Sequence, residues 1–214
     1  MRILVTAGPT REAIDAVRFL SNKSSGKMGY AIAEAAIKAG HDVILVSGPV
    51  ALTPPDGLLE FVPAISAADM AGAVKSRAAG CGMVIMCAAV ADYTPAHPLE
   101  RKMKKSGGNL FLELKRTEDI LKTLGQNKPA GQILVGFAAE TDGLEQYARE
   151  KLAAKNLDWI AANDVSRPDR GFAAGTNAVT LFSADGRRFD LPLQAKEDLA
   201  RQMLSILLPP KDPC

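Results

Sequence analysis

One nearly continuous apolar run, Met83-Val84-Ile85-Met86-Cys87-Ala88, constrains the fold of this chain most. A strand with apolar residues at odd and even positions alike is buried on both faces. That pattern is typical of the centre of a parallel sheet covered by helices on both sides, rather than of a sheet with one face in water.

Strand and helix signals alternate along the rest of the chain. Strands are predicted at 3–7, 42–47, 59–64, 110–114, 133–138 and 158–162, with residues 89–108 irregular. Helices are predicted up to Gly40 and at 67–79, 117–124 (capped by Thr117), 144–155 and 195–208. Alternating segments at 178–182 and 188–191 flank Asp185-Gly186, a hairpin signal. The pattern predicts an α/β fold: three layers (α/β/α) with a Rossmann-like, mostly parallel sheet and an antiparallel hairpin near one edge.

Length and composition fit an ordinary globular protein. The 214 residues fit a single domain, predicted at 1–208, with a flexible tail at 209–214. A net charge of +2 gives no indication of a nucleic-acid partner, and no apolar run reaches the length of a membrane span. The chain shows no secretory signal, and its three cysteines without metal-like spacing favour a reducing compartment, so the predicted location is the cytoplasm.

The segment between the first strand and the first helix is long and polar. A helix N-terminus in this position offers unpaired N–H groups to an anion. Ser24, Ser25 and Gly26 would let a phosphate approach the backbone closely, and Lys27 adds charge; a solvated loop is the alternative interpretation. A Walker loop is excluded because Met28 follows Lys27, and only Gly26-x-x-Gly29 is present of the dinucleotide fingerprint.

Unusual polar chemistry follows the strands, at the sheet edge where open α/β folds bind ligands. Asp92 comes after the central strand and could bind a hydroxyl or a metal, or cap a turn. The small Ala88 and Ala89 leave room for a ligand. Phe137 could stack on a base or pack in the core.

Two groups of lysines invite a phosphate interpretation. Lys102 opens a basic run that precedes a Gly pair, which is either a solvated face or a lid that closes over phosphates. Lys151 and Lys155 stand four residues apart on a predicted helix and so share a face that suits a polyphosphate, although surface lysines at this spacing are common.

Together these blocks resemble phosphopantothenoylcysteine synthetase of the bacterial, CTP-dependent type. The resemblance covers nearly the whole chain and is carried by residues 5–12, 18–29, 46–50, 88–93, 102–105, 135–141 and 162–165. It implies a three-layer α/β homodimer in coenzyme A biosynthesis. The implied reaction activates 4′-phosphopantothenate with CTP and Mg²⁺ to an acyl-cytidylate and pyrophosphate, then couples L-cysteine and releases CMP.

The resemblance also implies roles for individual residues. Asn22 would hold the acyl-cytidylate for the cysteine step, and Lys102 would be the lid lysine; these two are the predicted catalytic residues. The predicted nucleotide contacts are Ala88, Ala89, Asp92, Lys102, Thr117, Glu118, Asp119, Ile120, Phe137, Lys151 and Lys155. The predicted phosphopantothenate or phosphate loop comprises Gly8, Ser24, Ser25, Gly26 and Lys27. The segment 117–120 departs from the family's pattern, since many relatives read Asn-Pro-Asp-Ile there. No protein metal ligand is assigned.

Many bacterial relatives carry this domain behind a flavin-dependent decarboxylase. No such domain is present in the sequence, so neither FMN nor decarboxylation is assigned, and a decarboxylase domain is a partner only if the chain is an excised fragment. Two other classes of function are the alternatives. A non-catalytic nucleotide-binding module would not need the Asn22 loop and the Lys102 segment together, and a flavin or NAD oxidoreductase should show the missing dinucleotide fingerprint.

Overall fold

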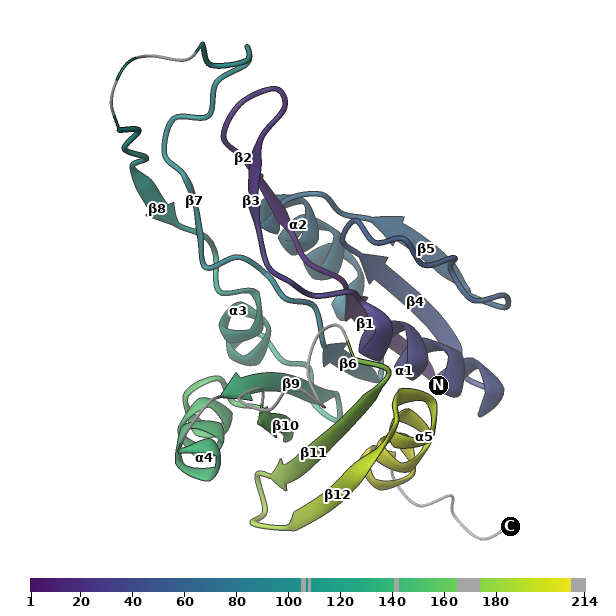
Figure 1. Cartoon of the computed structure of the whole chain (residues 1–214). Helices are drawn as coiled ribbons and strands as arrows, with labels where there is room; N and C mark the ends of the chain where they lie inside the picture. The colour runs from purple at the N-terminus through teal and green to yellow at the C-terminus, as the bar shows by residue number, and fades with distance from the viewer. Residues whose placement is uncertain (105–106, 108, 141–142, 165–173, 209–214) are drawn as a thin grey trace, which may run out of the picture.

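The computed structural model describes residues 1–104, 107, 109–140, 143–164 and 174–208. Eight strands form one sheet in the order β12-β11-β10-β9-β6-β1-β4-β5 (Figure 1). These strands are β1 (Arg2–Ala7), β4 (Asp42–Ser47), β5 (Glu60–Pro63), β6 (Met83–Met86), β9 (Ile133–Glu140), β10 (Trp159–Asp164), β11 (Thr176–Ser183) and β12 (Arg188–Ala195). The strands from β5 to β10 are parallel, while β11 and β12 run antiparallel at one edge. The predicted α/β fold with an edge hairpin is confirmed.

Helices cover both faces because side chains alternate along each buried strand. On β1, Ile3 and Val5 face a core formed with α1 (Lys27–Lys38) and α5 (Lys196–Leu207). Leu4 faces the opposite core, formed with α2 (Ala67–Ala78), α3 (Ile120–Gln126) and α4 (Leu144–Ala154). All three of these β1 side chains are completely buried, as a doubly covered central strand requires.

The chain order of the strands reverses beside β1. From β1 the sheet grows toward β4 and β5 on one side and toward β6, β9 and β10 on the other. At such a switch point the chain leaves the two neighbouring strands toward opposite faces of the sheet, and a crevice forms outside their carboxyl ends. Here the loops after β1 and β6 run beside each other, with Ala89 N donating to Gly8 O at 2.9 Å and Thr10 N donating to Ala89 O at 3.3 Å.

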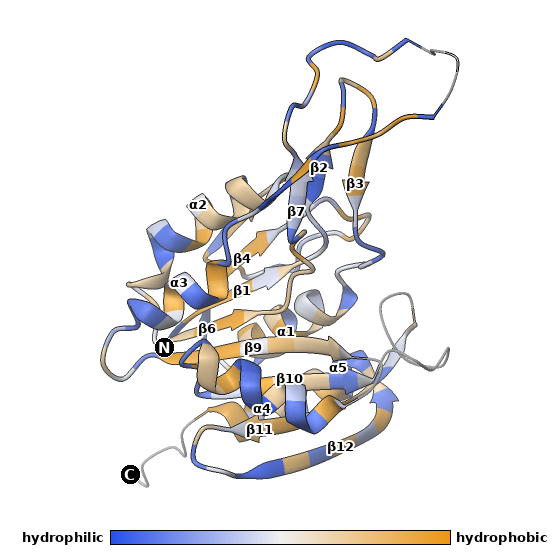
Figure 2. Ribbon diagram, turned by 90° about the vertical axis from the view of Figure 1, so that its left-hand side faces the viewer, coloured by the Kyte–Doolittle hydropathy of each residue, from blue (hydrophilic) through white to orange (hydrophobic). Residues whose placement is uncertain are grey.

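An arm projects from the sheet above this crevice (Figures 1 and 2). It consists of the described residues of 11–21 and 93–116, which form the hairpin β2 (Arg11–Ala13) and β3 (Phe19–Ser21) and the pair β7 (Tyr93–Pro95) and β8 (Leu114–Arg116). Several large apolar side chains stay exposed on it: Val17, Phe19, Tyr93, Leu99, Leu110, Phe111, Leu112 and Leu114. Figure 2 shows hydrophobic stretches within the arm.

Two predicted elements in this region are wrong. The strand predicted at 110–114 is absent from the described residues, because β8 begins only at Leu114 and leaves Phe111 88% exposed. The helix predicted from Thr117 begins at Ile120, with Asp119 as its cap. Thr117 cannot cap it because its hydroxyl donates to Ala91 O at 2.6 Å.

Neither β2–β3 nor β7 was expected from the sequence, because three-residue strands carry too little periodicity to stand out. The tail predicted at 209–214 lies outside the described residues.

Asp15 ties the two halves of the arm together. Its carboxylate accepts hydrogen bonds from Val17 N and Arg18 N, both at 2.8 Å, and from Met103 N at 3.1 Å. It also pairs with the Arg18 guanidinium at 3.1 Å. The hydrogen bond from Val17 N contributes most to lowering the pKa of Asp15, and the bonds from Met103 and Arg18 add to it against the opposing effect of burial.

We therefore expect Asp15→Asn to loosen the arm without unfolding the sheet. An amide cannot accept at both ends, so the Met103 N–H loses its acceptor and should exchange with solvent faster. Since the folded pKa is lowered, the carboxylate's contribution is fully present above its unfolded pKa of about 3.8 and is lost as the pH falls through the lower folded value. Amide exchange followed by NMR measures both effects. The exposed Asp42→Asn is the control, and unchanged Met103 exchange in Asp15→Asn would contradict the prediction.

Candidate functional site

A cavity of about 410 Å³ lies at the carboxyl edge of the sheet beside the switch point. This volume is in the range of small-molecule sites. Its walls come from parts of the chain that are distant in sequence: the loop before α1, the end of β6 with the loop after it, residues 117–121, β9, α4, β10 and the starts of β11 and α5. The lining residues include 22, 24–29, 86–92, 117–121, 137–139, 151, 155, 163, 177 and 196.

The loop before α1 forms one wall and depends on glycine. Gly26 has φ +78° and caps α1 with no side-chain hydrogen bond, so the first N–H groups of the helix have no acceptor within it. A Cβ on Gly26 would lie 2.8 Å from Val50 Cγ1. Gly29 allows α1 to approach β1, since a Cβ there would lie 2.6 Å from the Ala7 Cβ. The predicted phosphate loop therefore presents the positive end of α1 to the cavity.

Asn22 is held at the mouth of the cavity by the loop after β6. Its Nδ2 donates to Ala89 O at 3.0 Å, across 67 residues of sequence. The same carbonyl accepts from Thr10 N, so the two loops at the switch point are joined by backbone and side chain together. The amide group is neutral and exposed, and therefore available to a bound molecule.

The segment 117–120 forms the opposite wall. Thr117 N donates to Asp92 O at 3.0 Å, which docks this segment against the loop after β6. The carboxylate of Glu118 pairs with Lys75 on α2 at 2.7 Å, and the hydrogen bond from Lys75 is the main reason that the pKa of Glu118 is lowered. The Glu118 side chain is thus already engaged with α2.

Lys151 and Lys155 both line the cavity from α4 and its C-terminal cap. The Nζ of Lys155 lies 2.9 Å from Asp119, which also accepts from Lys122 N at 3.0 Å as the cap of α3. Burial raises the pKa of Asp119, but the hydrogen bonds from Lys122 and Lys155 outweigh it and leave the value lowered. Lys155 thus bridges α4 to the 117–120 wall. Phe137 is half-buried beside them, on β9.

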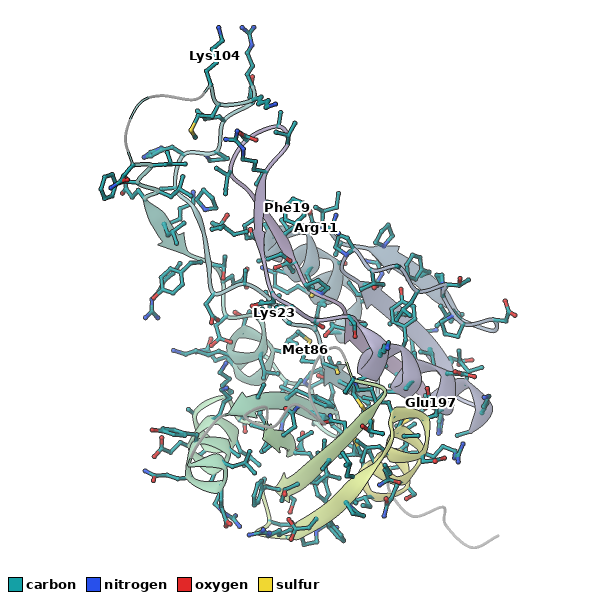
Figure 3. The ribbon with its side chains drawn as sticks, in the orientation of Figure 1. Arg11, Phe19, Lys23, Met86, Lys104 and Glu197 are labelled. Carbon is teal, nitrogen blue, oxygen red and sulfur yellow. The ribbon has the colours of Figure 1, made fainter. Side chains whose placement is uncertain are left out.

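Lys102 and Gly8 do not line this cavity. Lys102 is an exposed residue of the arm, next to Met103, whose N–H is bound by Asp15. Figure 3 shows the neighbouring Lys104 at the far end of the arm, well away from Lys23 and Met86. Among the described residues of this segment, Lys102 and Lys104 lie away from the cavity, and the lid role of Lys102 stays a prediction. Gly8, with φ +74°, lies behind the loop and supports it.

Sequence reasoning missed Met28, Cys87, Asn177 and Lys196 as lining residues. Asn177 and Lys196 come from the edge hairpin and the helix that follows it, where β11 starts and β12 ends at the same edge as the parallel strands. Asn177 and Lys196 do not follow the carboxyl end of a parallel strand, so the sequence rule used here did not point to them. Cys87 is not a candidate nucleophile, because burial raises the pKa of its thiol to about 12.

Neither a metal cluster nor a membrane span is found in the described part of the chain. No group of three or more His, Cys, Asp or Glu side chains within it could hold a metal ion. None of the helices described here is both long and apolar enough to cross a membrane.

Comparison with known proteins identifies the family. Residues 1–209 match the DNA/pantothenate metabolism flavoprotein C-terminal domain. The chain belongs to this family. The resemblance seen in the sequence is confirmed at this level, and the family extends over all but the last residues of the chain.

Curated relatives are bifunctional proteins of coenzyme A biosynthesis. The chain is 58% identical over 202 residues to the CoaBC protein of Bacillus subtilis. The matched region covers 94% of this chain and 50% of the relative. It is 46% identical over 208 residues to the CoaBC protein of Escherichia coli K12, covering 95% of this chain and 50% of the relative. The chain thus spans about half the length of these relatives.

Solved structures agree with the fold. The C-terminal domain of a CoaBC protein is 48% identical with a TM-score of 0.82, over 96% of this chain and 92% of that one. The DNA/pantothenate metabolism flavoprotein from Streptococcus pneumoniae is 27% identical, also with a TM-score of 0.82, over 96% and 97% of the two chains. A Cab2 mutant in complex with phosphopantothenate-cysteine, 19% identical with a TM-score of 0.76 over 96% and 85%, shares the fold.

Gly26→Ala tests whether the shape of the loop matters for binding. Alanine at φ +78° costs roughly 1–2 kcal/mol of stability, and its Cβ must also displace Val50 or the loop. Gly131→Ala is a matched control, since Gly131 also has φ +78° but a Cβ there would meet no described atom within 4 Å. We expect both variants to lose stability in urea denaturation, Gly26→Ala the more because of the Val50 contact, but weaker pyrophosphate binding only in Gly26→Ala. Equal binding by both variants would refute the role of the loop.

Proposed function

We propose that residues 1–208 form a single domain with phosphopantothenate–cysteine ligase activity, using CTP and L-cysteine. The proposal rests on one observation: Asn22, the 24–27 loop, Lys151 and Lys155 all line the same cavity. The sequence resemblance alone assigns these same segments to the acyl-cytidylate, the phosphate and the nucleotide. Family membership and the bifunctional relatives in coenzyme A biosynthesis support the same activity.

The reaction proceeds in two displacements. A carboxylate oxygen of 4′-phosphopantothenate attacks the α-phosphorus of CTP, the bond to the oxygen that bridges the α- and β-phosphates breaks, and pyrophosphate leaves. The cysteine nitrogen then attacks the acyl carbon of the mixed anhydride, loses a proton, and CMP departs with the bonding electrons. Both steps bring anions together, so the protein must supply fixed positive charge and hydrogen-bond donors.

The residues at the cavity suit these steps. Lys151, Lys155 and the start of α1 present positive charge to the phosphates, while Phe137 offers a flat face to the base. Asn22, anchored on Ala89 O at 3.0 Å, can orient the activated carbonyl without competing as a nucleophile. Small residues at Ala88 and Ala89 leave space for the ligand beside the strand end.

Magnesium fits this site as a partner of the nucleotide. Mg²⁺ bound to nucleotides commonly takes one or two carboxylates and completes its shell with phosphates and water, so it needs no cage of protein ligands. Asp92, which lines the cavity and is exposed, is the carboxylate we propose for this contact. The ion would neutralise charge on the transferring phosphate. We propose no FMN for this domain.

We propose that the chain works as a homodimer joined through the arm. Exposed apolar side chains such as Phe111, which is 88% exposed, gather on the arm and would be buried by a second copy. Lys102 lies on the same arm, away from its own cavity. The arm would therefore deliver Lys102 to the cavity of the partner subunit.

The remaining assignments concern cellular context. We propose a cytoplasmic location, consistent with the free Cys81 and Cys87, and no nucleic-acid or membrane partner. In a bifunctional protein of the relatives' length, the other half would be a decarboxylase domain that supplies the same pathway.

The activity is tested with the purified chain, 4′-phosphopantothenate, L-cysteine and MgCl₂. We expect pyrophosphate release that requires both CTP and phosphopantothenate, with the amide product identified by mass spectrometry. ATP should give at least about tenfold less product. A site that hydrogen-bonds cytosine has polar groups that adenine would leave unpaired. Pyrophosphate release without phosphopantothenate, or no amide with either nucleotide, would contradict the proposal.

Mixed dimers test whether Lys102 acts across the subunit interface. Asn22→Asp and Lys102→Ala should each lower the rate by about 10²–10³ as homodimers, the loss expected for one preorganised donor. Random mixing of the two variants should restore about a quarter of wild-type activity, because half the dimers then contain one site with both residues intact. If both residues act within one chain, each site of a mixed dimer still carries one of the two substitutions. Mixing then restores no activity. Each variant mixed with itself is the control.

A further inference from the structure

Two helices begin at the same corner of the cavity. Lys27 is the first residue of α1 and Lys196 the first residue of α5, and both line the cavity. Each helix has 12 residues, and neither has a side-chain hydrogen bond at its N-cap, which is Gly26 in one and Ala195 in the other. Two positive helix ends and two ammonium groups therefore converge there.

Lys196 is unusual for a lysine because it is only 3% exposed. Burial contributes most to lowering its pKa, and the nearby charge of Lys27 lowers it further, against smaller opposing effects of Cys87 and Glu197. A lysine at the surface would relieve both penalties by turning into water. Because Lys196 also lines the cavity, its ammonium group borders the space that a bound anion would occupy.

Asn177 provides an independent sign of a ligand. It lies near the start of β11, is 3% exposed and lines the same cavity. Its Oδ1 is buried and has no hydrogen-bond partner among the described residues. Rotation of the amide by 180° exchanges oxygen and nitrogen, so the group can offer either a donor or an acceptor to a bound molecule. A buried polar atom left unpaired is costly, and a ligand or its bound water would satisfy it.

The acidic side chains nearby lie on another side. Glu34 and Glu197 line a neighbouring cavity of about 660 Å³, which Lys27 and Lys196 also border, but neither glutamate lines the first cavity. Figure 3 shows Glu197 on α5. An anion bound in the first cavity would therefore contact Lys27 and Lys196 on a side that neither Glu34 nor Glu197 lines.

We propose that Lys196, with Lys27 and Asn177, forms the subsite for the β- and γ-phosphates of the nucleotide, from which pyrophosphate leaves. This inference rests on the proposed function and extends it to a residue outside the resemblance. A polyphosphate is the matching ligand because the corner gathers several positive groups, whereas Lys151 and Lys155 stand on the separate wall formed by α4 and 117–120. In this subsite Lys196 binds the pyrophosphate leaving group directly.

Isothermal titration with CTP, CMP and inorganic pyrophosphate tests the subsite. Lys196→Met keeps most of the length of the side chain and removes its charge. We expect roughly a 10- to 150-fold loss of affinity for CTP and for pyrophosphate, the range for a charge-assisted hydrogen bond, with CMP binding nearly unchanged. Lys196→Arg should restore most of the CTP affinity. Lys38→Met, on the exposed end of α1, is the control and should bind all three like wild type.

A purely structural role for Lys196 predicts different results. It would lower the thermal midpoint of unliganded Lys196→Met and weaken CTP and CMP equally, whereas a binding role leaves the midpoint unchanged or raised because a desolvated charge is removed. Equal losses for CTP and CMP, or wild-type CTP affinity, would overturn the inference.

Asn177→Asp provides a second test if Lys196→Met does not fold. A carboxylate at the orphan position should repel pyrophosphate, and unchanged pyrophosphate affinity would count against the subsite. Wild-type protein that binds CTP through Lys196 but forms no amide would contradict the proposed function alone.

Discussion

The site depends on the contact between the loops after β1 and β6. Beyond the sheet edge, Ala89 N still donates to Gly8 O at 2.9 Å, and Ala89 O accepts from both Thr10 N and Asn22 Nδ2. These bonds continue the strand pairing into the crevice where the strand order reverses. Beyond these bonds the two loops no longer pair, so backbone groups and small side chains face the cavity instead of a neighbouring strand.

Glycine makes this approach possible. Gly48 lies so close to the loop after β1 that a Cβ on it would be 1.8 Å from Pro9 O, and Gly26 meets Val50 in the same way. The loops around the cavity therefore pack against one another, and a side chain at either position would force them apart. Glycine is required at these positions because the loops pack too closely for a side chain. The same close packing sets the shape of the cavity.

Charge is distributed unevenly around the cavity. On the wall formed by 117–120, Asp119 and Glu118 are engaged by Lys155 and Lys75, so these groups balance each other. At the corner where α1 and α5 begin, burial contributes most to lowering the pKa of Lys196, and the nearby charge of Lys27 lowers it further. The ion pairs stabilise the 117–120 wall, and the two lysines at the corner suit an anionic ligand.

The sequence by itself determined the layered α/β fold, because apolar runs such as Met83–Met86 can be buried only between two helical layers. It also predicted which segments meet, since the polarity of parallel strands places their following loops at one edge. Only the tertiary structure decided the start of α3 at Ile120, because the Thr117 hydroxyl bonds to a loop distant in sequence. It also placed Lys102 on an arm and brought Asn177 and Lys196 to the cavity, because long-range packing sets the direction of a hairpin and local periodicity carries no record of it.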